Sequence, residues 1–322
     1  MAERVVGEAG FVDRMMEQQG RRSSASLERI DGLVDWAALS GHLSGLYASP
    51  LGEKAFPALV MFKVALLQCW HGLSDPAMEA ALDDRISFRR FAGLSLEDPV
   101  PDHATIWRFR QRLAERGLDQ VLLREVERQL DGAGLILKRG TLIDASLVES
   151  AARRPRMREG KTSQTDKDAR FGANNERRRF VFGYKMHVAV DEGPALVRAA
   201  ILTPANIQEI DMAAELVRGD EAKVLADRGY DSRRLYDHLQ KLGIADGVMR
   251  RGQRDKPLDA EGLERNHAIS AVRRTVEKVF GTFKRHYHLN RMRYFTQSRN
   301  QVRFLISAIC YNLRRMDVIT AT

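Results

Sequence analysis

Residues 273–284 read Arg273-Arg274-Thr275-Val276-Glu277-Lys278-Val279-Phe280-Gly281-Thr282-Phe283-Lys284. At 100° per residue, this stretch and the residues just before it predict a helix with one broad apolar face. The members of that face are Ile269, Val272, Val276, Val279, Phe280 and Phe283. Arg273, Glu277 and Lys284 follow one another at spacings of four and seven residues, so they form a narrow stripe beside the face. The stripe is either a solvated salt-bridge ladder or a carboxylate held between two cations at the edge of the core.

Two aspartates upstream favour the second interpretation. Asp144 lies in the middle of a short apolar β run, and Asp227 follows directly after another. Ligands meet open α/β sheets at the carboxyl ends of the strands. If the two strands are neighbours and the helix packs against them, Asp144, Asp227 and Glu277 converge. Three converging carboxylates offer the hard oxygen ligands that Mg²⁺ or Mn²⁺ prefers, and two such ions can drive chemistry at a phosphodiester.

The pattern from Thr141 to Met249 predicts a mixed sheet. The β runs lie at residues 141–145, 180–190, 196–202, 222–226 and 244–249, and the helices among them at 207–217 and 233–242. Three strands in a meander, followed by alternating helix and strand, are typical of a mixed α/β sheet with helices on its faces. A last apolar helix is expected at residues 301–315.

The N-terminal part predicts helices only. Residues 1–55 are irregular with short helical pieces, and residues 56–135 hold helices that begin at Ser74 and Asp102 caps. The helix after Asp102 is rich in arginine, and its Arg108, Arg110 and Arg112 are expected on the exposed surface. Short helices ending in an arginine-rich one indicate a helix-turn-helix-like module that binds DNA. The alternative is a plain helical bundle with a solvated arginine face.

Basic charge is concentrated in two segments. The net charge of the chain is +9, but residues 151–179 carry +6 and residues 249–322 carry +10, so the remainder is net negative. Such segregation indicates a polyanionic partner, most simply DNA or RNA. In the loop 151–179 we expect Arg153, Arg154, Arg177 and Arg178 to contact the DNA backbone. The alternative is a solubility charge on a loop and a tail.

Other classes of protein are disfavoured by what the sequence lacks. There is no apolar run of eighteen residues and no secretion signal at the start, so a membrane partner is not expected. Two cysteines in apolar helical patterns predict buried thiols in a reducing compartment. We expect the protein in the cytoplasm, associated with the nucleoid.

The residues that carry the chemistry resemble those of DDE transposases, most closely the insertion-sequence-five family of bacterial insertion sequences. The resemblance rests on Asp144 in its strand, on Ala226-Asp227-Arg228-Gly229-Tyr230-Asp231 and on the spacing Arg273-x3-Glu277-x6-Lys284. It extends to four further segments between roughly residues 50 and 318: Pro101-Asp102-His103-Ala104-Thr105-Ile106-Trp107-Arg108-Phe109-Arg110, Asp166-x-Asp168-Ala169-Arg170, Gly183-Tyr184-Lys185-Met186-His187 and Thr203-Pro204-Ala205-Asn206. The family's tyrosine three residues before the arginine is replaced here by Ser270, which cannot stack on a base.

The resemblance implies an RNase H-like catalytic domain over residues 136–322, in which Asp144, Asp227 and Glu277 hold two Mg²⁺ or Mn²⁺ ions. Arg273 and Lys284 would hold phosphates or order the acidic residue. His187 is a candidate to face the metal site, although a strand could equally turn it outward. Asn206 is a candidate DNA contact or an ordinary helix cap.

The expected function is therefore that of a DNA transposase. It would bind the terminal inverted repeats of its element, cleave them and join the 3′-hydroxyl ends to target DNA, as a homodimer or larger assembly when two ends are paired. One alternative is a non-catalytic DNA-binding protein, a decayed or recruited transposase acting as a repressor. Another is an RNase H-like nuclease of repair that shares the metal site.

Overall fold

The computed structural model describes residues 3–18, 25–47, 54–156, 162–174, 179–252 and 257–321. The chain forms two compact units. One combines Met1–Gln129 with Ile309–Thr322, and the other is Leu130–Ala308. Across the described ranges, no helix combines the length and the apolar character needed to cross a bilayer.

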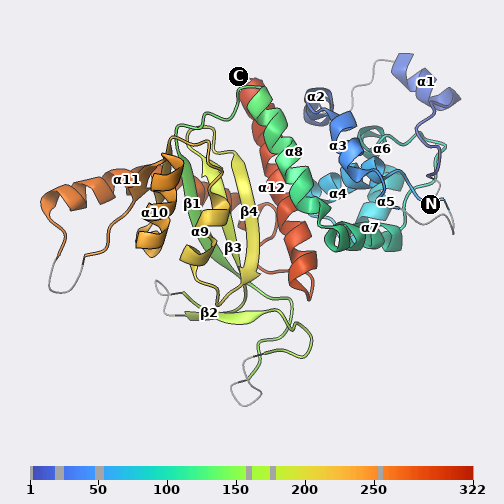
Figure 1. The fold of residues 1–322 in the computed structure, drawn as a ribbon. Coiled ribbons are helices and arrows are strands. Elements are labelled where there is room, and N and C mark those ends of the chain that lie inside the picture. The colour runs from blue at the N-terminus through green and yellow to red at the C-terminus, as the bar shows by residue number, and fades with distance from the viewer. Residues whose placement is uncertain are drawn as a thin grey trace. The chain divides into compact units, whose positions relative to one another are not determined.

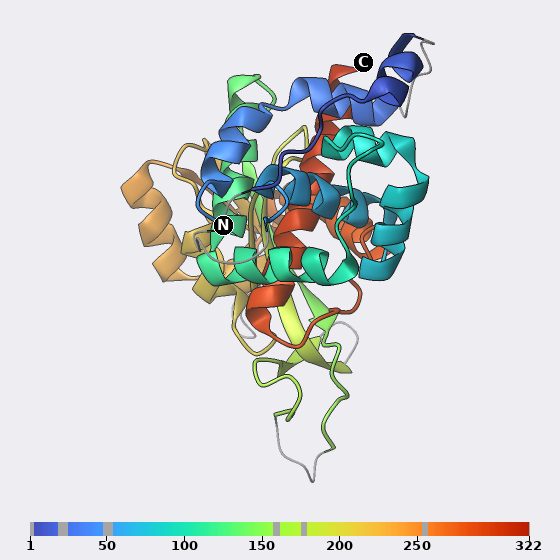
Figure 2. The ribbon, with the colours of Figure 1, turned by 90° about the vertical axis from the view of Figure 1, so that its right-hand side faces the viewer.

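The first unit is helical. Its elements are α1 (Phe11–Gln18), α2 (Ala25–Leu33), α3 (Trp36–Leu43), α4 (Ala58–His71), α5 (Asp75–Asp84), α6 (Ile86–Ala92), α7 (His103–Arg116) and most of α8 (Leu118–Gly132). The apolar helix α4 is almost entirely buried and packs against α3, α5, α6 and α7 (Figure 2). The predicted caps are confirmed, since Ser74 accepts from the Ala77 amide and Asp102 from the Thr105 amide. Helix α2 was not predicted.

The second unit is built on a six-stranded mixed sheet (Figure 1). The strands are β1 (Thr141–Glu149), β2 (Arg170–Asn174), β3 (Arg179–Asp191), β4 (Val197–Pro204), β5 (Lys223–Ala226) and β6 (Ala245–Val248). Strand β1 pairs antiparallel with β3 and parallel with β5, while β6 pairs parallel with β5. Both β2 and β4 pair antiparallel with β3. The expected fold class, an RNase H-like mixed α/β sheet preceded by a helical N-terminal part, is confirmed.

Helices cover both faces of the sheet. On one face, α9 (Ala213–Leu216) and α10 (Arg233–Leu242) pack on a core that includes Ile143, Ala189 and Val224. The short helices η2 (Glu209–Met212) and η3 (Arg228–Tyr230) lie next to each other at the strand ends. The predicted helix at 207–217 is thus split into η2 and α9.

Helix α11 (Ala260–Arg285) packs against β1 and β5. The apolar face predicted for it is confirmed: Val272 is half-buried, and the other five members, Ile269, Val276, Val279, Phe280 and Phe283, are buried. Helix α12 (Gln297–Thr320) follows, and two of its glutamines protect the outer edge of β4. Gln297 donates to the Leu202 carbonyl, and Gln301 bonds both the Leu202 amide and the Ala200 carbonyl. Side chains that occupy these backbone groups cover part of the edge strand, which disfavours its pairing with another chain.

Candidate active site

Strands β1 and β5 bring Asp144 and Asp227 to the same level of the sheet, just beyond the carboxyl end of β5. Leu142 is the register partner of Leu225, and each aspartate lies two residues further along its own strand direction. Because side chains alternate along a strand and neighbouring strands lie about 4.8 Å apart, this register sets the two aspartates side by side. Asp227 begins η3 and accepts a hydrogen bond of 2.7 Å from the Gly229 amide, which fixes the orientation of its carboxylate.

Asp144 is the electrostatic centre of the site. Its pKa is raised to about 7, mainly by burial and also by the charges of Asp227 and Glu209, against the opposing effects of Arg273 and of the Ala145 amide. The Oδ2 atom lies 3.1 Å from Arg273 Nη2, and the Oδ1 atom accepts a bond of 2.8 Å from the Ala145 amide. A buried carboxyl beside other carboxylates favours any added cation, because the cation relieves both burial and repulsion.

Helix α11 lays its charged stripe along this face of β1. Arg273 reaches Asp144, and Lys284 Nζ donates a bond of 2.6 Å to Ser146 Oγ, two residues further along the same strand face. Glu277 lies between them on the helix, about 6 Å along the axis from Arg273, and is exposed. Within the described ranges, no three His, Cys, Asp or Glu side chains stand close enough together to hold a metal ion. The structure therefore brings Asp144 and Asp227 together and leaves Glu277 beside them in solvent.

Glu209 is a neighbour that sequence reasoning did not assign to the carboxylate cluster. Burial raises its pKa, Lys185 opposes this, and the charge of Asp227 raises it again. Its Oε1 atom lies 3.5 Å from Lys185 Nζ. The strand directions explain its position. Strand β4 runs parallel to β1 and β5, so residues that follow β4 leave the sheet on the same side as Asp227.

Tyr230 is a second neighbour that was not predicted. The side chain is fully buried, and its hydroxyl has no hydrogen-bond partner among the described residues. Burial raises its pKa well above the ordinary value, and the charges of Asp144, Glu209 and Asp227 add to this. The hydroxyl therefore remains a hydrogen-bond donor at the edge of a negatively charged cluster.

His187 and Asn206 lie away from Asp144. The register partner of Asp144 is Val188, so His187, one residue earlier on β3, points to the opposite face of the sheet. Its ring is buried, with Nε2 2.8 Å from Thr203 Oγ1. Asn206 is exposed in the turn after β4, and it does not cap the following helix, because that position is taken by Gln208.

The arginines predicted to bind DNA differ in exposure. Arg108, Arg153 and Arg154 are exposed. The expectation that Arg110 is exposed is wrong: its guanidinium is buried and bonds Gln68 Oε1 at 2.8 Å and Asp75 Oδ2 at 2.6 Å. Arg110 faces inward because it lies four positions after Ile106 and three before Leu113, on the buried side of α7. Arg177 and Arg178 lie outside the described residues.

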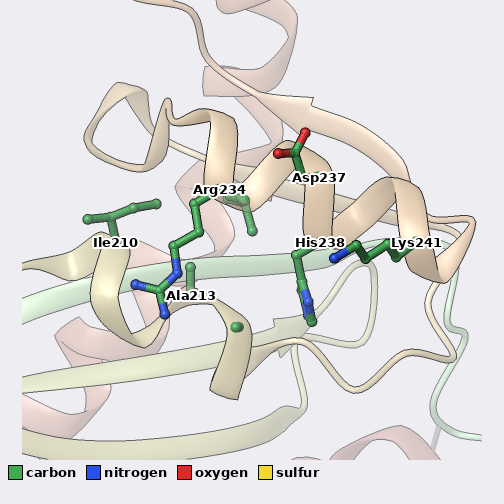
Figure 3. Close-up of a pocket in the computed structure, with 8 residues that line it drawn as sticks. Ile210, Ala213, Arg234, Asp237, His238 and Lys241 are labelled. Carbon is green, nitrogen blue, oxygen red and sulfur yellow. The ribbon is translucent and has the colours of Figure 1, made fainter.

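A separate hollow of about 330 Å³ lies beside α10 (Figure 3). Arg234 extends from α10 toward Ile210 and Ala213, and His238 extends to the same side of α10, whereas the Asp237 carboxylate points to the opposite side. None of the predicted site residues lines this hollow. Its described lining combines basic and apolar side chains with the Asp237 carboxylate, so it lacks the converging carboxylates that metal-dependent chemistry needs.

Comparisons with known proteins identify the family of the chain. The family described as transposase DDE domain matches residues 136–313, and a second family, described as a transposase domain, matches residues 14–112. Among solved structures, a Mos1 transposase paired-end complex with left transposon end is 12% identical over 69% of this chain and 80% of that chain, with a TM-score of 0.21. A pre-cleavage Mos1 transpososome is 13% identical over 77% of this chain and 78% of that one, with a TM-score of 0.20. TM-scores this low do not establish a shared fold.

Proposed function

This chain belongs to the transposase DDE domain family, and from that we propose that it is a DNA transposase resembling those of the insertion-sequence-five family. It binds the terminal inverted repeats of its own mobile element, cleaves the DNA there and joins the 3′-hydroxyl ends to a target. The observation that carries the proposal is the pair Asp144 and Asp227, side by side on neighbouring parallel strands.

The two aspartates fit a divalent metal. Arg273 and the Ala145 amide each occupy one oxygen of Asp144, but a carboxylate oxygen has two lone pairs, so both oxygens keep a site for another partner. The raised pKa of Asp144 supports the same assignment, because the pocket favours an added positive charge. We assign Asp144, Asp227 and Glu277 as the residues that hold one or two Mg²⁺ or Mn²⁺ ions. Such ions activate an attacking oxygen and stabilise the leaving oxygen of a phosphodiester.

The remaining site residues orient the Asp144 carboxylate and bind DNA. Arg273 holds the Asp144 carboxylate in place, and Lys284, anchored on Ser146, adds positive charge where a DNA phosphate would lie. The exposed cations Arg108, Arg153 and Arg154 contact the DNA backbone. In this proposal the helical region 56–135 binds the element ends, and two copies of the protein pair two ends.

Asp227→Ala tests the site. With Mg²⁺ and a duplex containing the inverted repeat that flanks the gene, wild-type protein is expected to nick the element end. Loss of a metal ligand should lower the cleavage rate at least about 10³-fold, because metal-ion catalysis contributes several kcal/mol and each 1.4 kcal/mol is tenfold in rate. The matched control is Asp237→Asn on α10, whose side chain is 56% exposed and which should cleave normally. Full cleavage by Asp227→Ala would exclude the proposed metal site.

The second candidate is a DNA-binding protein without catalysis. The exposure of Glu277 favours it, since the described residues gather no three-ligand metal site. In that case, footprinting would show protection of the inverted repeats, and no cut would appear with Mg²⁺, Mn²⁺ or Ca²⁺. Metal-dependent cleavage that disappears in Asp227→Ala would eliminate this candidate.

A further inference from the structure

A groove of about 490 Å³ lies in the sheet unit beyond the end of β1. One wall is the segment from Glu149 to Arg154, and the other is the start of β3 around Phe180 and Phe182, with Arg291 at the side. Neither Asp144 nor Asp227 lines it. The groove is therefore separate from the carboxylate site.

The floor of the groove is held rigidly by hydrogen bonds. The Ser150 amide donates to the Phe182 carbonyl at 3.0 Å, and Ser150 Oγ donates to the buried Asp166 at 2.6 Å. Arg291 donates from Nε to the Ser150 carbonyl at 3.0 Å and from Nη2 to the Ala151 carbonyl at 2.9 Å. A groove fixed in this way exists before any ligand arrives, which lowers the entropy cost of binding.

Its lining combines an exposed aromatic ring with cations. Phe180 is 60% exposed, which is unusual for a large apolar side chain. Arg153 and Arg154 are exposed, and the Arg154 guanidinium lies 5.3 Å from the centroid of the Phe171 ring. Among the described lining residues there are three arginines, Arg153, Arg154 and Arg291, and one carboxylate, Glu149. The lining is therefore net positive. Aromatic faces flanked by basic side chains are what proteins use to stack bases and track phosphates in single-stranded DNA.

The DNA must be unpaired at this point for a base to stack on the Phe180 ring. In a duplex, the faces of the bases are covered by their neighbours, and only base edges are accessible in the grooves. A base face becomes available to Phe180 only where a strand is unpaired or a base leaves the stack.

The groove is also within reach of the reacting position. Glu149 lies five residues beyond Asp144 on β1, which is about 17 Å along the strand. That length corresponds to about five base steps of B-form DNA. A DNA strand that runs from the aspartates along β1 would reach the groove within about five nucleotides.

We propose that this groove binds an unpaired segment of the DNA substrate, with a base stacked on Phe180 and its phosphates held by Arg153 and Arg154. The inference rests on the proposed function, because it takes DNA as the substrate of the neighbouring site. It adds that the protein prefers DNA ends with unpaired nucleotides close to the cleavage position.

The test measures binding without cleavage, by fluorescence anisotropy in EDTA. The probes are a blunt duplex and the same duplex with a five-nucleotide single-stranded extension carrying 2-aminopurine. Wild-type protein is expected to bind the extended duplex more tightly and to quench the 2-aminopurine by stacking. Phe180→Ala should weaken binding of the extended duplex about 5- to 150-fold, because stacking contributes about 1–3 kcal/mol per base. Phe180→Trp should retain both signals.

The control is Phe11→Ala, which removes a ring that is 74% exposed in the helical unit and should leave both signals unchanged. Equal affinity of wild-type protein for the two duplexes, or unchanged 2-aminopurine quenching by Phe180→Ala, would refute the proposal that the groove binds unpaired DNA. These outcomes are independent of catalysis. If Asp227→Ala cleaves normally while Phe180→Ala loses the preference, the metal site fails and the groove stands. If Asp227→Ala loses metal-dependent cleavage while Phe180→Ala still prefers the extended duplex, the metal site stands and the groove proposal fails.

Discussion

His187 belongs to a segment whose polar side chains each have a partner inside the sheet unit. Its ring bonds Thr203, the adjacent Lys185 pairs with Glu209, and the Tyr184 hydroxyl donates to the buried Asp166 at 2.6 Å. Burial lowers the pKa of His187 to about 3, and the charge of Lys185 acts in the same direction. The ring is therefore neutral in the folded protein, and its hydrogen bond to Thr203 joins β3 to β4.

This neutral histidine should make the sheet unit sensitive to acid. The pKa of His187 is lower in the folded state than its ordinary value of 6.5, so its contribution to stability is complete above about pH 6.5 and is lost as pH falls toward 3. The loss should approach about 1.4 kcal/mol per pH unit in that window. His187→Gln keeps a hydrogen-bonding group for Thr203 without titrating. Urea unfolding followed by far-ultraviolet circular dichroism at pH 7, 5 and 4 should show a smaller decline for the variant. Parallel declines would contradict a buried neutral ring.

At the scale of elements, the close pairing of the end of β1 with β3 depends on a glycine, Gly183, which has no side chain. A Cβ atom on Gly183 would lie 2.1 Å from the Val148 carbonyl oxygen and 2.6 Å from the Ser150 amide nitrogen. Both are backbone atoms held in the sheet, so neither can move aside cheaply. Glycine at this position lets the end of β1 lie against β3, and that contact also builds the floor of the groove at Ser150.

Gly183→Ala is therefore expected to destabilise the sheet unit. Overpacking in a well-packed region costs about 1–3 kcal/mol, and a clash with backbone falls at the upper end or beyond it. Gly132→Ala is the matched control, since a Cβ there meets nothing within 4 Å and its backbone angle is ordinary. Thermal unfolding should separate the two variants. Similar melting temperatures would show that the strands can separate at little cost.

At the scale of the whole molecule, the two ends of the chain share one unit. Residues from Ile309 onward belong with the N-terminal helices, where Arg29 Nε donates to Asp317 at 2.5 Å and Trp70 Nε1 donates to the Cys310 carbonyl at 3.0 Å. Leu313 is almost fully buried there, whereas Val318 on the same helix is 58% exposed. The helical unit is therefore complete only after the last helix has been made.

The three tryptophans of the chain, Trp36, Trp70 and Trp107, all lie in this helical unit, so their fluorescence reports on it selectively. Leu313→Ala should lower the free energy of unfolding of the helical unit, measured by tryptophan fluorescence, by about 2–5 kcal/mol, as expected for truncating a buried leucine. Val318→Ala should change it by less than about 0.5 kcal/mol, because it lies on the surface. The measurement is urea unfolding at constant pH. An unchanged midpoint in Leu313→Ala would mean that the C-terminal residues contribute nothing to the helical unit.

Several features of this protein are determined by local sequence alone. The helical period around Val276 and Phe283, the caps at Ser74 and Asp102, and the five predicted strands are all confirmed, because each depends on side-chain spacing within a few residues. The family motifs predicted a DDE transposase in the same way, since their spacing is readable in one dimension.

Other features were decided only by the tertiary structure. Whether Arg110 is exposed depends on Gln68 and Asp75 from other helices, and the side of the sheet that His187 faces depends on its register with β1. Glu209 joins the aspartates only because β4 ends at the same edge as β1. Strand β2 forms through pairing with β3, and its own short sequence carries no alternation strong enough to predict it. The physical reason is common to all four: burial and charge environment are set by residues distant in the chain, which local periodicity does not contain.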